Sequence, residues 1–327
     1  MNKQNIYTGD SKLSELICRN CNLLLVMSRF GISLGFGDNT VQEVCEKQNV
    51  DTDTFLAVAN FMEKESPHND KIGKNISVES LVHYLQQAHS YFLDFCLPAI
   101  RRKLIESIDY SGNDLVVHIL KFYDEYVNEV RSHMEYEDRT VFKYVDALLN
   151  GKDTEGYSIS VFEEKHNQIA EKMSDLKNTI IKYYPSHLNP NQINSVLFDI
   201  FSCEKDLTLH CKVEDLIFIP AIRQLEEEMN TPVKNDKNET PKINALKTSN
   251  GTDKTVSQEI LSKREKEIIT CIAKGMSNKE IADKLFLSTH TVITHRKNIT
   301  RKLQIYSPAG LTIYAIVNKL IKLQDVN

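Results

Sequence analysis

Apolar residues recur at helical spacing through most of this chain. Four long segments share the period, each bounded by a break rich in Gly, Pro or Asn: 78–107, 112–150, 158–184 and 190–229. Four consecutive helices joined by short loops favour an up-down four-helix bundle. Only 11 Gly and 8 Pro occur in 327 residues, which argues against a turn-rich β architecture. We therefore predict an all-α fold.

Shorter helical segments precede the bundle, and a polar stretch follows it. Upstream we predict a helix that ends at Gly31 and, after a turn, helices over 41–48 and 51–64. Residues 230–256 are rich in Asn, Lys and Thr and predict a flexible linker. We expect four parts: a small helical domain (1–75), the bundle (76–229), the linker (230–256) and a C-terminal helix-turn-helix domain (257–327).

The C-terminal domain contains serines placed to begin helices. Ser262, Ser277 and Ser288 each precede a helical repeat, and Gly275 suits the left-handed turn after the first helix. The third helix is apolar on the face of Val292, His295, Ile299 and Leu303. Its other face is polar and cationic: Thr294, Arg296, Lys297, Arg301 and Lys302. Two short helices joined by a tight turn, the second cationic on one side, are typical of a major-groove reader.

The charge of the chain is uneven. Residues 257–327 hold 12 Lys/Arg against 6 Asp/Glu, which leaves 28 against 39 for the rest. A basic domain on an acidic body indicates a polyanion partner for that domain alone. A cationic helical domain that binds another protein is the alternative.

This C-terminal segment resembles the LuxR-type helix-turn-helix family. The resemblance covers about 60 residues and lies in LSKRE, GMSNKEIA, LSTHTV and RKL. It implies that 291–303 lies in the major groove of double-stranded DNA and that the last helix helps to form a homodimer. It also implies base-facing Ile293, Thr294 and Lys297, with phosphate contacts from Thr291, Arg301 and Lys302.

The bundle carries histidines and glutamates on all four predicted helices. The potential metal ligands are His89 on the first, His118, His133 and Glu137 on the second, His166 on the third, and His210 and Glu214 on the fourth. A spacing of four residues puts each His–Glu pair on one helical face. The two pairs occur in similar contexts, HMEYED and HCKVED, which suggests a pseudo-symmetric site in the bundle core.

Five imidazoles and two carboxylates suit a pair of metal ions. If both carboxylates and an oxo or hydroxo group bridge two irons, five histidines complete one iron and leave the other with an open position. The order His-x-x-x-Glu differs from the Glu-x-x-His of ferritin-like proteins. Taken one at a time, each histidine could instead be a hydrogen-bonded core residue.

This constellation resembles the hemerythrin-like family, and more narrowly its branch involved in repair of iron centres. The resemblance implies two non-haem, oxo- or hydroxo-bridged irons held by those seven residues. Residues 13–62 resemble the small domain that precedes the bundle in that branch, through RFGI (29–32) and VQEVCEKQNVD. In the branch two adjacent cysteines follow the turn, where this chain has Gly35 and Phe36, so we expect a packing or dimerising role here.

The seven cysteines are scattered and odd in number, which is typical of reduced thiols. Cys18 and Cys21 form one CxxC, but no second pair follows at zinc spacing, so we expect mostly buried, inert thiols. No apolar run is long enough to span a membrane, and the first residues lack a signal-peptide pattern, so we expect a cytoplasmic protein.

Together these features predict a transcription regulator whose di-iron bundle senses oxygen, nitric oxide, peroxide or redox state. The alternative is an enzyme or iron donor that repairs iron centres or reduces nitric oxide, with DNA binding secondary; we favour the non-enzymatic reading. A third hypothesis is a metal-free bundle that only dimerises the DNA reader.

Overall fold

A computed structural model describes residues 7–64, 76–107, 114–152, 154, 156–163, 169–184, 190–230, 261–322 and 325–326. The chain divides into two compact units, Met1–Glu227 and Glu228–Asn327. Within the described residues the regular elements are all helical, and a single antiparallel bridge joins Lys12 to Thr40. The all-α prediction is therefore confirmed. Nearly all of the linker predicted over 230–256 lies outside the described residues.

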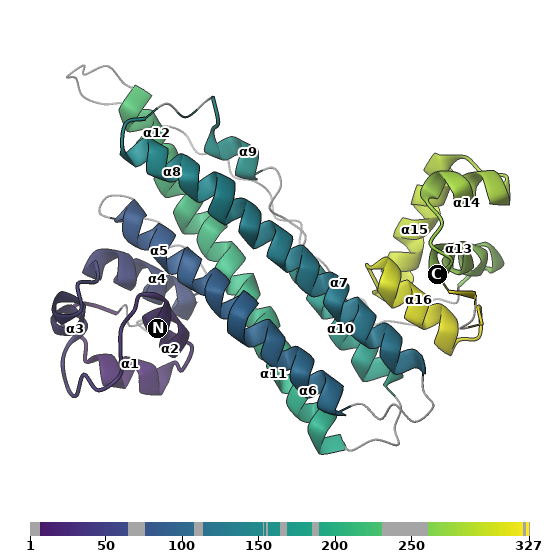
Figure 1. The fold of residues 1–327 in the computed structure, drawn as a ribbon, viewed down its shortest axis with the longest axis horizontal. Helices are drawn as coiled ribbons and strands as arrows, with labels where there is room; N and C mark the ends of the chain where they lie inside the picture. Colours follow the sequence, from purple (N-terminus) through teal and green to yellow (C-terminus); the bar gives the residue numbers. More distant parts are fainter. Residues whose placement is uncertain are drawn as a thin grey trace, which may run out of the picture. The chain divides into compact units, whose positions relative to one another are not determined.

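The N-terminal region folds into four short helices (Figure 1): α1 (Leu13–Arg19), α2 (Leu23–Arg29), α3 (Val41–Lys47) and α4 (Thr52–Lys64). The single helix predicted up to Gly31 is divided in two, because α1 ends at Asn20, whose side chain accepts a hydrogen bond from the Asn22 amide. Asn and Asp side chains compete with helical hydrogen bonding in this way. Thr40 and Glu43 form a reciprocal capping box that begins α3.

The RFGI motif connects this region to the bundle. Arg29 and Phe30 are buried, and Phe30 contacts the rings of Phe55 and Tyr84. Gly31 adopts φ +75°, and the amide of Ile32 donates to the carbonyl of Met27, which closes the end of α2. The motif thus combines a helix stop with two side chains directed into the core.

The bundle helices follow the predicted segments closely and are each composed of shorter pieces. In order they are α5 (Val78–Ser90), η1 (Tyr91–Cys96) and α6 (Leu97–Ser107); α7 (Asp114–Tyr136), η2 (Glu137–Val141) and α8 (Phe142–Leu149); α9 (Ile159–Glu163) and α10 (Ile169–Tyr183); α11 (Pro190–Val213), η3 (Glu214–Phe218) and α12 (Ile219–Asn230). Here α6 packs on α7 and α11, and α10 packs on the same two helices, which closes the four-helix arrangement seen in Figure 1.

The N-terminal helices and one end of the bundle share a continuous hydrophobic core. Helix α2 packs on α5, and α4 packs on α11. Buried Leu23 and Phe55 of the first region belong to the same cluster as Leu85 and Phe218 of the bundle. The small helical region is therefore a structural part of the bundle unit, which agrees with a packing role.

In the part of the bundle that the structure describes, three π-helical segments, η1, η2 and η3, interrupt the helices. Pro98 follows η1 and Pro220 follows η3, each two residues beyond the segment's end. Proline lacks an amide donor and clashes with the carbonyl four residues earlier, so a widened turn there relieves the strain. Single π-helical turns are frequent at functional sites.

Over residues 261–322 the C-terminal unit contains α13 (Lys263–Ala273), α14 (Asn278–Leu285), α15 (Thr289–Leu303) and α16 (Pro308–Val317). Ser262, Ser277 and Ser288 cap the first three, and Gly275 adopts φ +74°, as predicted. Ile281, Val292 and Ile299 form part of its core. None of the described helices in either unit has the length and apolar character needed to cross a bilayer.

Candidate metal centre and nucleic-acid interface

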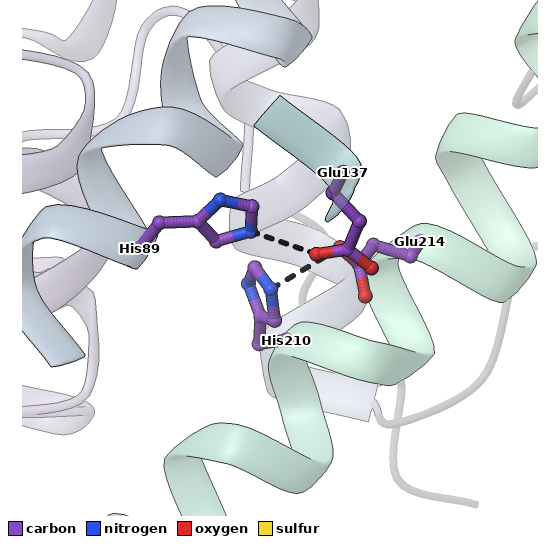
Figure 2. Close-up of side chains that lie close together, drawn as sticks. All are labelled: His89, Glu137, His210 and Glu214. Atoms are coloured by element: carbon purple, nitrogen blue, oxygen red, sulfur yellow. Dashed lines mark ion pairs between the residues drawn. The ribbon is translucent and has the colours of Figure 1, made fainter. Parts of the chain in front are cut away.

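Four of the predicted ligands converge inside the bundle. His89 lies on α5, Glu137 begins η2, and His210 and Glu214 lie where α11 passes into η3 (Figure 2). One ligand atom from each lies within 4.8 Å of the others, and all four side chains are buried. Each carboxylate is the first residue of a π-helical segment, so the widened turns begin at the site itself.

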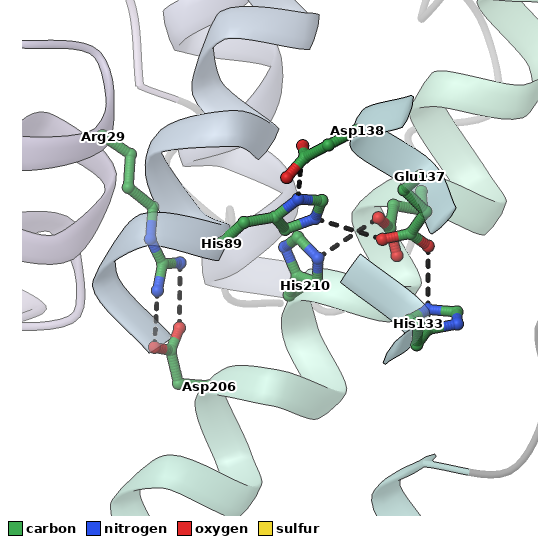
Figure 3. Close-up of polar contacts among 8 residues, drawn as sticks. Arg29, His89, His133, Glu137, Asp138, Asp206 and His210 are labelled. Atoms are coloured by element: carbon green, nitrogen blue, oxygen red, sulfur yellow. Dashed lines mark hydrogen bonds and ion pairs between the residues drawn. The ribbon is translucent and has the colours of Figure 1, made fainter. Parts of the chain in front are cut away.

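Glu137 is the side chain that connects most of the cluster. Its Oε2 lies 3.1 Å from Nε2 of His89, and its Oε1 lies 2.8 Å from Nε2 of His133 (Figure 3). On the fourth helix, Oε1 of Glu214 lies 3.2 Å from Nε2 of His210. Each His-x-x-x-Glu pair thus meets on one helical face, as its spacing predicts.

Aromatic and acidic neighbours orient the imidazoles. Nδ1 of His89 lies 2.9 Å from Oδ1 of Asp138, so its Nε2 is the nitrogen directed to Glu137. A carboxylate on the far nitrogen is characteristic of metal-binding histidines. The ring of His89 also stacks on Phe142 at 5.6 Å and meets the ring of His210 edge-on at 5.2 Å.

The cluster is electrostatically suited to positive charge. Burial alone would lower the pKa of His89, but hydrogen bonds to Asp138 and Glu137 and the charges of Glu137 and Glu214 raise it to about 9. Two carboxylates this close and this buried repel one another unless a proton or a cation lies between them.

The residues present fit a bound metal ion. Nδ1 of His210 has no hydrogen-bond partner among the described residues, and Nε2 has only the Glu214 carboxylate 3.2 Å away, although the side chain is buried. Buried imidazole and carboxylate donors that meet at one point are the usual ligands of iron, zinc and manganese. In the described part of the chain this is the one such group of four.

The other predicted ligands have different positions. His133 is mostly buried and joins the cluster through Glu137. His118 is half-buried on α7 and is outside the group of four. His166 lies outside the described residues. His83, which has the polar Gln86 and Gln87 one turn further along the helix, is exposed and lies outside the group.

Asp138 is a functional candidate that the sequence reasoning did not single out. Its signal was present, because an Asp follows the Glu in both HMEYED and HCKVED. Glu137 belongs to the His–Glu cluster, and the next residue, Asp138, contacts the opposite nitrogen of His89.

A buried ion pair lies one helical turn from the cluster. The guanidinium of Arg29 donates to both carboxylate oxygens of Asp206, at 2.9 Å and 2.6 Å (Figure 3). It also lies 5.2 Å from the ring of Phe92, which contacts His210. The N-terminal helices thereby reach the surroundings of a predicted ligand.

In the C-terminal unit, most of the predicted DNA-contacting side chains of α15 are available to a partner. Ile293, Thr294, Lys297 and Arg301 are exposed, and Thr291 is half-buried beside Ser288. A hollow of about 530 Å³ on this helix is lined by Asn278, Ile293, Arg296, Lys297, Thr300, Arg301, Gln304 and Tyr306. The hydrogen bond from Arg296 to Asn278, 2.8 Å long, fixes α15 against α14.

Lys302 is placed differently from its neighbours. Its ammonium lies 2.9 Å from Oε2 of Glu265, inside the domain, and its side chain is mostly buried. A phosphate contact by Lys302 therefore requires that ion pair to open.

The thiols differ in part from expectation. Cys45, Cys203 and Cys271 are buried and Cys96 and Cys211 are half-buried, but the CxxC pair, Cys18 and Cys21, is exposed. The pair lies at the break between α1 and α2, which faces solvent. At the position of the missing cysteine pair, Gly35 has φ +93°, a conformation that a cysteine would adopt only with strain.

Comparisons with known proteins divide the chain in the same way. Residues 80–222 match the family described as Hemerythrin HHE cation binding domain, and residues 259–315 match the bacterial regulatory proteins of the luxR family. The Oxygen regulatory protein NreC of Staphylococcus carnosus (strain TM300) is 44% identical over 85 residues, which cover 25% of this chain and 39% of that protein. The NreC of Staphylococcus aureus (strain JH9) is 49% identical over 75 residues, 23% of this chain and 33% of the relative.

These relatives are similar to the C-terminal helices alone, and the chain spans less than two fifths of their length. Both predicted resemblances are confirmed: the chain joins a hemerythrin-like domain to a LuxR-type helix-turn-helix domain. The first match implies cation binding in the bundle, and the second implies DNA binding at the C-terminus.

Proposed function

We propose that this protein is a DNA-binding transcription regulator whose bundle holds two non-haem irons and senses oxygen, nitric oxide or peroxide. The observation that carries the proposal is the convergence of His89, Glu137, His210 and Glu214 in the bundle core. In the same chain, a capped helix presents cationic and polar side chains in the manner of a major-groove reader.

The bundle residues divide into bridging and terminal donors in this proposal. Glu137 and Glu214 are the carboxylates suited to bridge, since each has two oxygens and lies next to a histidine of its own helix. His89, His133 and His210 are terminal donors, and we propose His118 and His166 to complete the set. A pair of irons with one open position supplies reversible binding or oxidation–reduction of a small molecule.

The protein around the site controls access and orientation. Asp138 holds His89 with Nε2 toward the site, and Phe142 and Phe92 cover the two imidazoles. These apolar rings keep bulk water away from the site, which favours small uncharged ligands over large or charged ones. Oxygen and nitric oxide are of that kind.

The signal must pass between separate compact units. The segment that joins them is predicted from its composition to be flexible, and a flexible tether cannot transmit a rigid push. We therefore propose that the state of the bundle changes homodimerisation or domain docking, and so changes how readily α15 reaches DNA.

A combined spectroscopic and DNA-binding experiment tests this function. Full-length protein, loaded with iron, is mixed with a DNA site selected from a random pool, before and after exposure to nitric oxide, oxygen or peroxide. We expect the iron absorption spectrum and the DNA affinity to change together. His210→Ala should lose both responses, while His83→Ala, an exposed histidine of the first bundle helix, should keep them.

The sensor proposal would be contradicted if the iron-loaded protein bound DNA with the same affinity alone and after exposure to nitric oxide, oxygen or peroxide. Transfer of iron to an apo-cluster protein without DNA dependence would support the repair alternative instead. If the protein binds DNA but never takes up iron, the remaining hypothesis is a metal-free bundle that only dimerises the DNA-binding domain.

A further inference from the structure

Two cysteines face each other in the bundle outside the metal cluster. Cys96 ends η1 on the first bundle helix, and Cys203 lies on α11 of the fourth. Cys96 follows His89 by seven residues and Cys203 precedes His210 by seven, so in antiparallel helices the thiols meet about two turns, or about 10 Å, from the imidazoles. Helix α6, which Cys96 directly precedes, packs on α11, and the rings of His89 and His210 lie 5.2 Å apart, so this register brings the two thiols within reach of each other. The hydroxyl of Tyr91 lies close enough to Cys96 to affect its ionisation.

The surroundings of the two thiols are unequal. Cys96 is partly exposed, whereas Cys203 is 2% exposed. The hydrogen bond from Cys203 lowers the pKa of the Cys96 thiol, although burial opposes the shift. The same hydrogen bond, together with burial, raises the pKa of Cys203 well above its ordinary value. A thiol that ionises readily and is accessible is the one that reacts with oxidants.

We propose that Cys96 and Cys203 form a peroxide-reactive dithiol that closes to a disulfide between the first and fourth bundle helices. The thiolate of Cys96 attacks one oxygen of hydrogen peroxide, which breaks the O–O bond, forms a sulfenic acid and, with a proton, releases water. The thiol of Cys203 then attacks the sulfenic sulfur, which forms the S–S bond and releases a second water. In sum, two thiols are oxidised and one peroxide is reduced to two waters.

The other thiols lack this arrangement. Cys45 and Cys271 are buried in hydrophobic clusters, and burial raises the pKa of Cys211 well above its ordinary value. Cys18 and Cys21 are exposed and would consume peroxide without bearing on the pair. The reaction needs no iron, so it goes beyond the function proposed above.

Peptide mapping of the full-length protein tests the proposal. Cys18→Ser/Cys21→Ser protein, both iron-loaded and stripped with a chelator, is treated with one equivalent of hydrogen peroxide and digested without reductant. We expect a disulfide-linked pair of peptides that contain Cys96 and Cys203, in both preparations. Cys203→Ser should stop at a sulfenic acid on Cys96 that dimedone traps, and Cys96→Ser should abolish both products. Cys45→Ser is the matched control and should leave the linked peptide unchanged.

If a serine variant at Cys96 or Cys203 fails to fold, differential alkylation tests the same proposal. It uses the Cys18→Ser/Cys21→Ser protein, in which both thiols of the pair are intact. Cys96 and Cys203 should lose reactivity together after peroxide, and dithiothreitol should restore both. Oxidation confined to other cysteines, or sulfenic acid that persists on Cys96 while Cys203 stays reduced, would overturn the proposal. A linked peptide seen only with iron present would overturn the metal-independent reaction.

Discussion

Asp138 supports the buried His–Glu cluster without belonging to the proposed ligand set. It accepts a hydrogen bond from the far nitrogen of His89, while the near nitrogen meets Glu137. Outer partners of this kind fix the tautomer and raise the basicity of a metal-binding imidazole. Asp138, which lies on the second bundle helix next to Glu137, therefore fixes the orientation of His89 on the first.

We expect Asp138→Asn to weaken iron binding by about 10–100-fold without removing a ligand. The amide keeps the size of the side chain but loses the charge that favours the correct tautomer of His89. Titration of iron against a competing chelator measures the change. Glu135→Gln, a partly exposed change on the same helix, is the control. Equal affinity for Asp138→Asn and wild type would refute the supporting role.

Glu265 links the start of one C-terminal helix to the reading helix. It accepts from the amide of Ser262 in the capping box and pairs with Lys302 of α15. Burial opposes ionisation, but these hydrogen bonds and the lysine charge hold the pKa of Glu265 below its usual 4.5. A carboxylate with a lowered folded pKa contributes stability above its unfolded pKa and loses it as the pH falls through the folded value.

The C-terminal unit should therefore lose stability in acid, and Glu265→Gln should remove part of that loss. At neutral pH the variant should be less stable by about 1 kcal/mol. Thermal unfolding across the acid range, followed by circular dichroism, measures both effects. Glu280→Gln changes a capping box that is exposed and lacks a lysine, so its effect should be smaller. Identical acid profiles for Glu265→Gln and wild type would exclude the assignment.

At the scale of elements, the contact of α2 with the bundle depends on a buried charge pair. Arg29 and Asp206 are nearly inaccessible, and the guanidinium also faces the rings of Tyr91 and Phe92. Removal of one partner of such a pair leaves the other charge buried and unpaired, whereas apolar replacement of both can be neutral.

Arg29→Met should destabilise the bundle unit by about 3–5 kcal/mol, because Asp206 is left as a buried charge. Arg29→Met/Asp206→Leu should recover most of that loss. Chemical denaturation of the full chain gives the comparison. Arg19→Met breaks an exposed pair with Glu15 on the neighbouring helix and should cost less than about 1 kcal/mol. If the double variant were no more stable than Arg29→Met, the unpaired charge of Asp206 would not be the cause of the lost stability.

Helical periodicity predicted the bundle helices and the capped C-terminal helices because these depend on spacing and on local caps. The π-helical turns that begin at Glu137 and Glu214 were not predictable in this way, since one widened turn leaves the surrounding period intact. The ion pair of Arg29 with Asp206 joins residues far apart in the chain, so no local pattern indicates it. The seven-residue ligand set stays a prediction; His118 is apart from the four-residue cluster and His166 lies outside the described residues.

At the scale of the whole molecule, the uneven distribution of charge favours polyanion binding by the basic C-terminal unit. The C-terminal unit presents Lys297 and Arg301 on the exposed side of α15, while the acidic remainder of the chain discourages DNA elsewhere. Phosphate contacts supply much of the affinity for DNA. That affinity falls as salt rises, because release of the counterions bound to DNA then gains less free energy.

DNA affinity should fall steeply with salt, and Arg301→Ala should reduce the slope of that dependence by about 1. Lys297→Ala should cost about 1–3 kcal/mol on the preferred site and relax its sequence preference. Fluorescence anisotropy over a series of salt concentrations measures both. Lys322→Ala, an exposed lysine beyond the last helix, should behave as wild type. Equal slopes for Arg301→Ala and wild type would remove Arg301 from the phosphate contacts.

The central claim is that the bundle binds a pair of irons through its buried His–Glu pairs. Iron quantification with Mössbauer spectroscopy on the full-length protein tests it most directly. We predict two irons per chain with the spectrum of a magnetically coupled pair, and loss of that pair in Glu137→Ala and Glu214→Ala proteins that remain folded. A chain that binds no iron, binds a single uncoupled iron, or keeps the coupled pair in both variants would contradict the account.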